Sequence, residues 1–278
     1  CARSTCWPRN KGHNSRSMSR SGYLVAGIAG MVGVGSAGYL GVYGGALANR
    51  YLSEPPTESQ RIARFDVLAP TWDKEIRPLE DKHGISALRE RLLQHVPKGA
   101  RVLEIAAGTG RNMSLYPRDC KVVMTDASDG MVQEMQKTLE EYTKEHKEAP
   151  EQFQLGILDA QTVPYGRSTF DCVVDTFGLC SVTNPRKTLD ELFRVLRPGG
   201  TILLLEHGKS EYAPVRWYQR ITAPQHLHDW GCFYDRPMVY LVEDSKFIVE
   251  EVDTCHAGTT VYVRATRPPH VDDLFQEA

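Results

Sequence analysis

The sequence predicts an α/β fold: a mostly parallel sheet of seven strands with helices on both faces, preceded by an N-terminal transmembrane helix. After about residue 61, short apolar runs alternate with longer amphipathic segments. The runs are apolar throughout instead of at every second residue, which is typical of parallel strands covered on both faces. The uncharged apolar segment 22–48 precedes this region and is long enough to cross a membrane.

The first 21 residues are basic. They contain five Arg or Lys and no Asp or Glu, which is the composition of a mitochondrial targeting segment. The whole chain has a net charge of −2, but without these five and Arg50 it has 27 basic and 35 acidic residues, a net charge of −8. An acidic body has no general attraction for phosphate backbones, so we expect no nucleic-acid partner.

Segment 22–48 is expected to be a single-pass anchor. A soluble helix explains it poorly, because each of its nine glycines would cost about 1 kcal/mol relative to Ala in water, whereas lipid tolerates Gly. A Gly-rich linker is the alternative. A stripe of small residues would let a partner transmembrane helix approach closely: Ala29, Gly33, Ala37, Gly41 and Gly45.

These segments predict a leader at 1–21, an anchor at 22–48, a linker at 49–60 and a main domain at 61–278. The basic leader points to the mitochondrial inner membrane. The basic segment before a membrane anchor usually stays on the negatively charged side of the membrane, which places the main domain in the intermembrane space. Import by another route would invert this orientation. The side of the main domain therefore stays open.

Strand and helix candidates in the main domain follow from apolar runs and amphipathic periodicity. Strands are expected at 101–106, 121–125, 152–157, 170–176, 201–205, 247–252 and 260–265. Helices are expected between them and before the first, at 85–96, 128–147 and 184–196. The last two strands have no helix between them, which indicates an antiparallel pair.

The seven cysteines are scattered along the chain. There is no Cys-x-x-Cys pair and no Cys/His cluster at the spacing of zinc ligands, so the sequence predicts no metal site. Several cysteines fall in strand-like apolar runs, where Cys is usually a small buried hydrophobic residue. We therefore expect reduced thiols.

The first strand runs into a glycine turn that opens a helix, Ala107-Gly108-Thr109-Gly110. Glycine in such a turn lets backbone N–H groups and a helix N-terminus approach a ligand. Any strand-to-helix turn can contain two glycines, however, so the turn by itself is weak evidence for a ligand site.

Acidic residues end the next two strands. Asp126 lies 22 residues after Glu104 and can accept hydrogen bonds from both hydroxyls of a ribose, or cap the following helix. Asp159 and Ala160 follow the third strand, where a short acid and a small residue could meet an adenine amino group and ring.

Together with segments 170–176 and 189–200, these features resemble class I S-adenosylmethionine-dependent methyltransferases over about residues 61–267. The resemblance implies a Rossmann-like fold and S-adenosylmethionine as cofactor. Ala106 replaces the first glycine of the family's Glu/Asp-x-Gly-x-Gly-x-Gly motif, a departure that adds one methyl group. The cofactor-binding residues that the resemblance implies are Glu104, Ala106, Gly108, Gly110, Asp126, Asp159, Ala160 and Thr176.

Two further segments refine this resemblance. Phe65-Asp66-x-x-Ala69-x-x-Trp72-Asp73 is similar to the Tyr-Asp-x-x-Ala-x-x-Tyr-Asp lid of the ubiquinone-methylating branch, although Phe65 and Trp72 can also be packing residues. Segments 178–184, 194–200 and 205–207 look like the membrane-anchored type 11 methyltransferases. That group includes the methyltransferase-like seven thiol methyltransferases and a mitochondrial inner-membrane relative in fungi.

The acceptor site is expected at the carboxyl ends of the strands, beside the insertion 212–242. An apolar anchor favours a lipophilic small acceptor, either a thiol or a quinol-like phenol. A thiol is partly ionised at neutral pH, whereas a phenol benefits from a base, for which His207 and His226 are the candidates. Other polar candidates are His228, Asp229, Tyr234 and Asp235, and each of the six can instead satisfy a local hydrogen bond.

Other functional classes are less favoured. No Asn/Asp-Pro-Pro-Tyr follows the fourth strand, which argues against an amide or adenine-nitrogen methylase. Cys180 lacks the Pro-Cys context of a cytosine-5 methylase nucleophile, so a packed thiol is favoured. The remaining alternative is a scaffold or assembly subunit of a mitochondrial membrane complex with little or no catalysis. The nearly intact cofactor motifs favour an enzyme.

Overall fold

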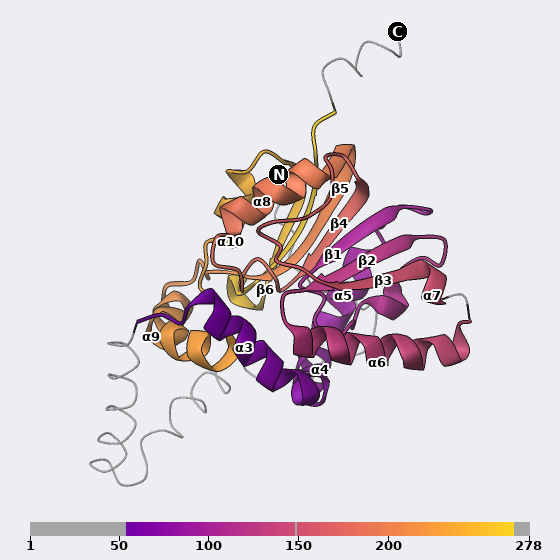
Figure 1. The fold of residues 1–278 in the computed structure, drawn as a ribbon. Helices are drawn as coiled ribbons and strands as arrows, with labels where there is room; N and C mark the ends of the chain where they lie inside the picture. Colours follow the sequence, from indigo (N-terminus) through magenta and orange to yellow (C-terminus); the bar gives the residue numbers. More distant parts are fainter. Residues whose placement is uncertain (1–53, 148, 270–278) are drawn as a thin grey trace, which may run out of the picture. The chain divides into compact units, whose positions relative to one another are not determined.

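The computed structural model describes residues 54–147 and 149–269 (Figure 1). The predicted leader, the anchor 22–48 and its stripe of small residues lie outside the described residues. Within the described ranges, no helix is both long enough and apolar enough to cross a membrane.

The described elements follow the predicted alternation of strands and helices. In chain order they are α3 (Glu58–Leu68), α4 (Trp72–His83), α5 (Ile85–Leu93), β1 (Arg101–Ile105), β2 (Lys121–Asp126), α6 (Asp129–Glu145), α7 (Ala149–Gln152), β3 (Phe153–Ile157), β4 (Phe170–Thr176), α8 (Pro185–Val195), β5 (Leu196–His207), α9 (Ala213–Trp230), α10 (Met238–Glu243), β6 (Ile248–Cys255) and β7 (Thr260–Thr266).

The sheet has the order β3-β2-β1-β4-β5-β7-β6, and only β7 runs antiparallel to its neighbours (Figure 1). The short connection between β6 and β7 leaves room only for an antiparallel pair, which confirms that prediction. Strands β1 to β5 are parallel, so their carboxyl ends meet at one edge. The strand order reverses between β1 and β4, where open α/β sheets bind ligands.

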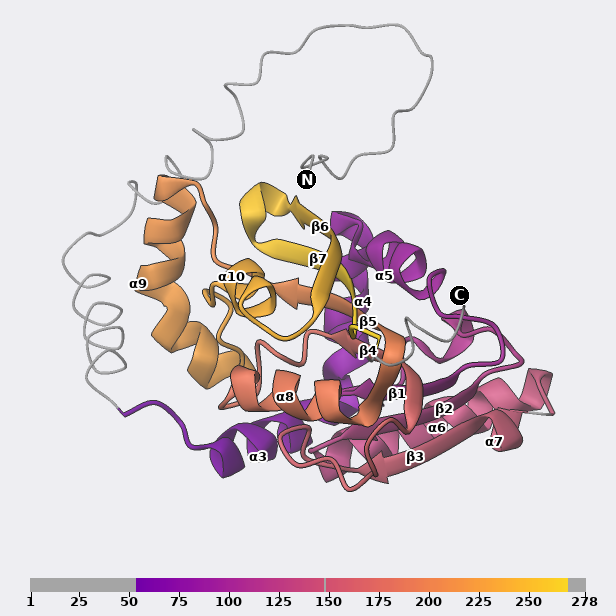
Figure 2. The ribbon, with the colours of Figure 1, turned by 90° about the horizontal axis from the view of Figure 1, so that it is seen from above.

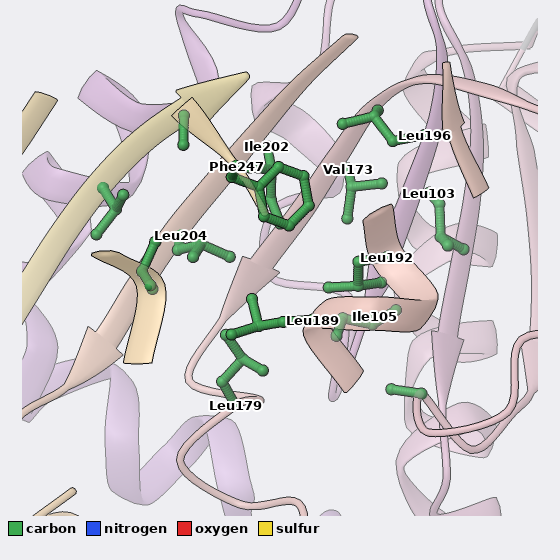
Figure 3. Close-up of a cluster of buried hydrophobic side chains, with 14 of the residues drawn as sticks. Leu103, Ile105, Val173, Leu179, Leu189, Leu192, Leu196, Ile202, Leu204 and Phe247 are labelled. Atoms are coloured by element: carbon green, nitrogen blue, oxygen red, sulfur yellow. The ribbon is translucent and has the colours of Figure 1, made fainter. Parts of the chain in front are cut away.

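Two helical layers cover the sheet, with α8 and α5 on opposite sides of the strands (Figure 2). On one face, Leu189 and Leu192 of α8 pack with Leu103, Ile105 and Val173 (Figure 3). On the other face, residues of α5 and α6 pack with the intervening residues of the same strands: Leu92, Leu93, Met135, Val102, Val122 and Met124. Both faces of the central strands are therefore apolar, as predicted.

Several boundaries differ from the sequence prediction. Strand β5 begins at Leu196 and not at 201, because Leu196 pairs with Phe170 before the register shifts. Helix α3 begins inside the predicted linker 49–60, where Thr57 and Gln60 form a capping box. Helices α4 and α9 were not predicted, because each contains an internal proline, Pro78 and Pro224, a residue that usually ends a helix.

The described cysteines divide into two states. Four are free and buried, as expected: Cys120, Cys172, Cys180 and Cys232. Cys255 is disulfide-bonded, so the expectation of reduced thiols holds only for these four.

Candidate active site

A cavity of about 400 Å³ lies at the carboxyl edge of the sheet, where the strand order reverses. Its walls come from the loops after β1 to β5 and from helices α3, α4, α5 and α9. Six of the eight predicted cofactor residues line it: Ala106, Gly108, Asp126, Asp159, Ala160 and Thr176. Both predicted histidines, His207 and His226, line the same cavity, whereas Glu104 and Gly110 do not.

The loop after β1 turns through three left-handed backbone positions, Ala106 (φ 47°), Gly108 (φ 57°) and Gly110 (φ 83°). A Cβ added to Gly108 would meet nothing within 4 Å, so at this position the loop presents only backbone atoms to open space beside the cavity. A Cβ on Gly110 would lie 2.9 Å from Met135 Cγ, so this glycine allows close packing against α6. Gly108 and Gly110 therefore serve different purposes, ligand approach and helix packing.

Glu104 supports this loop from beneath. Its carboxylate is fully buried and accepts hydrogen bonds from Asn112 Nδ2 (2.7 Å) and the Tyr116 hydroxyl (2.6 Å). Burial raises the pKa of Glu104 to about 7, against the opposing effect of these two hydrogen bonds. Asn112 in turn donates to Thr176 Oγ1 (3.1 Å), so Glu104 reaches the cavity wall only through other side chains.

Asp126 joins the loops after β1 and β2. Its Oδ2 accepts from the Gly108 N–H and its Oδ1 from the Ser128 N–H, both at 2.9 Å. A carboxylate has about four acceptor positions, so about two remain for a ligand diol. Burial raises the pKa of Asp126, and the backbone N–H groups oppose that rise.

The loop after β3 supplies the next wall. Asp159 Oδ1 accepts from the Gln161 N–H at 2.8 Å, which fixes the short turn. Ala160 is buried beside it, and Leu158 adds an apolar surface to the same wall. An exposed carboxylate beside two apolar side chains suits a flat heterocycle that carries an amino group.

Helices α3 and α4 cover the cavity, and the two acids of the lid motif attach them to the cofactor loops. Asp66 Oδ1 accepts from Ser128 Oγ (2.6 Å) and the Gly130 N–H (3.0 Å). Asp73 Oδ1 accepts from Thr109 Oγ1 (2.6 Å). Each acid of the motif thus binds a different cofactor loop.

The aromatic residues of the motif also line the cavity. Phe65 and Trp72 pack edge to face with ring centroids 5.9 Å apart, and Trp72 packs similarly on Trp230 of α9 at 6.2 Å. Together they form an apolar wall of the cavity. They are therefore packing residues that also line the site.

Two arginines that sequence reasoning missed also line the cavity. Arg89 binds Glu80 through Nε (2.9 Å) and Nη2 (3.0 Å), and its Nη1 donates to Thr176 Oγ1 (2.7 Å). Arg111 Nη1 lies 2.9 Å from the same Glu80, and burial lowers the pKa of Arg111. Two guanidinium groups that share one carboxylate suit a ligand carboxylate. No local motif marks them, because isolated arginines on helices and loops are ordinary.

The far end of the cavity holds the predicted histidines. The His207 ring lies 4.6 Å from Phe177 and 6.2 Å from His226, between ring centroids. Burial, with a smaller contribution from His207, lowers the pKa of His226 to about 4, so this imidazole is neutral at neutral pH. Tyr234 stacks on His226 at 4.2 Å.

The other four candidates lie outside the cavity wall: His228, Asp229, Tyr234 and Asp235. The Tyr234 hydroxyl bonds to Thr222, and the Asp229 carboxylate accepts from Gln225 Nε2. For these two, the local hydrogen bonds that the sequence left as an alternative are present.

Two thiols meet at His207. Cys180 Sγ lies 3.1 Å from Cys232 Sγ, and His207 Nδ1 lies 3.2 Å from Cys232 Sγ and 3.5 Å from Cys180 Sγ. Burial raises the pKa of Cys180 well above its ordinary value. Sequence reasoning missed Cys232, because it lies 52 residues from Cys180 and no local spacing connects them.

The cavity's donor set fits S-adenosylmethionine. Asp126 has acceptor positions for the ribose, and Asp159 with Leu158 and Ala160 suits the adenine. The guanidinium groups of Arg89 and Arg111 suit the methionine carboxylate.

Comparison with known proteins finds a family model and several relatives that match this chain. Residues 103–204 match the Methyltransf_11 family, described as a methyltransferase domain. The chain is 28% identical over 211 residues to Methyltransferase OMS1, mitochondrial, of Saccharomyces cerevisiae, covering 72% of this chain and 44% of the yeast protein.

Two further relatives are more similar over shorter regions. The chain is 34% identical over 128 residues to the ubiquinone/menaquinone biosynthesis C-methyltransferase UbiE of Cronobacter sakazakii, covering 43% of this chain and 47% of UbiE. It is 33% identical over 156 residues to thiol S-methyltransferase TMT1B of Rattus norvegicus, covering 52% and 59%. The chain thus spans about half the length of these relatives.

A solved structure shows the same fold. An S-adenosylmethionine-dependent methyltransferase from Thermotoga maritima is similar with a TM-score of 0.54 at 17% identity, over 74% of this chain and 99% of that one. Residues 103–204 thus match a methyltransferase domain, and the chain is similar in sequence to known methyltransferases.

Proposed function

We propose that this protein uses S-adenosylmethionine to methylate a lipophilic small acceptor, a thiol or a quinol-like phenol, at a mitochondrial membrane. The observation that carries the proposal is the single cavity that joins the cofactor residues to an apolar end with thiol and imidazole groups. A cofactor and an acceptor bound in one cavity react as an intramolecular pair.

The acceptor class follows from the walls of the far end. Phe65, Trp72 and Trp230 form its apolar surface, while His207 and His226 are its hydrogen-bonding groups. Such a surface favours a molecule that is largely apolar with one polar reacting atom. Two of the relatives are named for a thiol and for quinone biosynthesis, the two acceptor classes proposed here.

Bound S-adenosylmethionine supplies a methyl group that is already electrophilic. The residues of this chain therefore have to hold the acceptor atom in line, at about 3 to 3.5 Å, and keep water out. Because His226 is neutral at neutral pH, its imidazole can accept a hydrogen bond from a phenol or thiol.

A methylation assay tests the proposal. The full chain is incubated with S-adenosylmethionine and a panel of lipophilic thiols and phenols, and mass spectrometry detects the product. Asp126→Ala removes the ribose contact, so cofactor binding measured by calorimetry should weaken at least tenfold. Asp129→Ala changes an exposed acid three residues away and is the matched control.

The alternative role, a scaffold or assembly subunit of a membrane complex, predicts a different result. A chain that binds the cofactor but methylates no acceptor of the panel would contradict the enzyme proposal and favour the scaffold. The number of polar groups in this cavity that suit the cofactor argues for the enzyme, because a scaffold has no physical need for them.

A further inference from the structure

We infer that Cys180, His207 and Cys232 bind a zinc ion whose fourth position opens into the cavity. The three donor atoms come from distant parts of the chain and all lie within 4.8 Å of one another. All three residues line the cavity. The inference rests on the proposed function in one respect: the open position would hold the acceptor, which narrows the acceptor to a thiol.

The three donors are close enough together for one metal ion to bind them all. Tetrahedral zinc, with zinc–sulfur bonds of about 2.3 Å and zinc–nitrogen bonds of about 2.0 Å, places two sulfurs about 3.8 Å apart and a sulfur and a nitrogen about 3.5 Å apart. His207 Nδ1 lies 3.2 Å from Cys232 Sγ and 3.5 Å from Cys180 Sγ, near the tetrahedral value, whereas the two sulfurs lie 3.1 Å apart and have to separate when zinc binds. A disulfide would instead need about 2.05 Å between the sulfurs.

The backbone holds the two cysteines in place independently of the sulfurs. The Cys180 N–H donates to Glu206 Oε2 at 3.0 Å, and the Phe233 N–H donates to the Cys180 carbonyl at 2.8 Å. His207 lies at the end of β5, whose partner strands fix its backbone. Because the ligands are held before a metal arrives, little ordering is needed to bind one.

Two arginines and one buried carboxylate, that of Glu206, lie near the cluster. The guanidinium groups of Arg61 and Arg236 lie 5.2 and 4.2 Å from the ring centroid of Phe233, the residue after Cys232. Arg61 donates to the Ser181 carbonyl and Arg236 to the Leu179 carbonyl, on either side of Cys180. Thiolate is the form of cysteine that binds metals, and these cations oppose the burial that raises the pKa of Cys180.

Two thiolates and one imidazole select zinc among the common divalent ions. Among the described residues, no fourth His, Cys, Asp or Glu joins the cluster. Three protein ligands with an open position are characteristic of catalytic zinc, whereas structural zinc has four.

The proton balance is simple. Zinc binding releases one proton from each cysteine, which leaves a neutral site of one Zn²⁺ and two thiolates. An acceptor thiol releases a third proton to solvent and binds at the open position as thiolate. Its sulfur forms a bond to the methyl carbon while the bond from that carbon to the sulfonium sulfur breaks, and the neutral thioether product then dissociates.

The metal content of the tag-free full chain tests the inference. The protein is purified in detergent with a phosphine reductant, dialysed against zinc and then against buffer, and zinc is measured by mass spectrometry. We expect about one zinc per chain, falling at least tenfold in Cys180→Ser and in Cys232→Ser. Cys120→Ser changes a free buried cysteine outside the cluster and should retain the zinc.

Cobalt gives a readout that needs no variant. Cobalt-loaded wild-type protein should show a thiolate-to-metal charge-transfer band in the near ultraviolet, because two cysteine sulfurs bind the ion. Wild-type protein without stoichiometric zinc and without this band, or with a Cys180–Cys232 disulfide under reductant, would overturn the inference. Cofactor binding by calorimetry shows whether each variant is folded.

The outcomes separate the two proposals. Thiol methylation by metal-free protein would overturn the inference that zinc binds the acceptor thiol and would support the proposed function. Zinc-loaded protein that binds the cofactor but methylates only phenols would retain the metal site and overturn the thiol assignment.

Discussion

At the scale of single residues, Ala106 is where the chain departs from the glycine of the family motif. It has a left-handed backbone (φ 47°), which costs an L-residue about 1 to 2 kcal/mol. Its Cβ lies against Gly178, where an added Cβ would be 2.6 Å from that of Ala106 and 2.2 Å from Asp175 Oδ1. Ala106 is therefore tolerated because residue 178 is glycine.

A double-mutant cycle tests this dependence. Gly178→Ala should lower the free energy of unfolding by about 1 to 3 kcal/mol, because it overpacks a buried site. Ala106→Gly should recover part of that loss, since it removes one of the two clashes. Urea denaturation of the two single variants and the double variant measures the coupling. Strictly additive effects would contradict the proposed contact.

Glu104 predicts a pH dependence of stability. Its pKa is about 7 in the folded protein and ordinarily 4.5. Between these values the folded protein keeps a proton that the unfolded chain has released. The free energy of unfolding should therefore fall as pH rises from about 4.5 to about 7, by at most about 3 kcal/mol.

Glu104→Gln removes this titration and keeps a carbonyl that can accept from Asn112. As pH rises from about 5 to about 8, the wild type should lose stability and the variant should not, so the difference in free energy of unfolding between them should grow. Urea denaturation at both pH values measures this difference. Glu75→Gln, an exposed change on α4, is the control and should show no such increase. Parallel pH profiles for Glu104→Gln and wild type would refute the assignment.

At the scale of elements, the cover formed by α3 and α4 depends on a few polar contacts. Asp66 binds the start of α6, and Gly130 is needed there because an added Cβ would lie 2.9 Å from the Asp66 backbone. Asp73 binds the loop after β1 through Thr109. The cover is thus tied to the same two loops that Asp126 joins.

Asp66→Ala should therefore loosen α3 and weaken cofactor binding. Loss of hydrogen bonds to a charged group costs about 1.5 to 3 kcal/mol, which corresponds to about tenfold or more in the dissociation constant. Hydrogen exchange should increase in Glu58–Leu68, and calorimetry measures the affinity. Glu75→Ala on the same cover should leave both unchanged. Unaltered exchange in Asp66→Ala would show that this contact does not hold the cover.

At the scale of the whole molecule, the predicted anchor 22–48 would keep the acceptor cavity near a bilayer. That location would concentrate a lipophilic acceptor beside the cavity. The yeast relative is named as mitochondrial, which agrees with the basic leader of this chain.

Alkaline carbonate extraction of mitochondria measures membrane integration. The full chain should stay in the pellet, because about 20 apolar residues suffice to span the hydrocarbon core. A chain that starts at Tyr51 should be released into the supernatant and serves as the matched control. Release of the full chain would contradict the anchor, and protease protection in mitoplasts decides which side the domain faces.

The sequence alone predicted the seven strands in their order along the chain, the three helices α5, α6 and α8, and the cofactor motifs. Strands buried on both faces are apolar throughout, and a turn that approaches a ligand needs glycine, so both leave local patterns. Six of the eight residues predicted to bind the cofactor line one cavity, because they lie at or just after the carboxyl ends of parallel strands, which meet at one edge of the sheet.

Only the tertiary structure decided which residues meet from separate elements. Cys232 follows α9, which ends at Trp230 with the left-handed C-cap Gly231, and it reaches Cys180 by an approach that no spacing in the chain encodes. Arg89 likewise reaches Thr176 across 87 residues. Local sequence patterns reflect the backbone conformation and burial of each residue. Contacts between side chains that are distant in the sequence depend instead on how whole helices and strands pack.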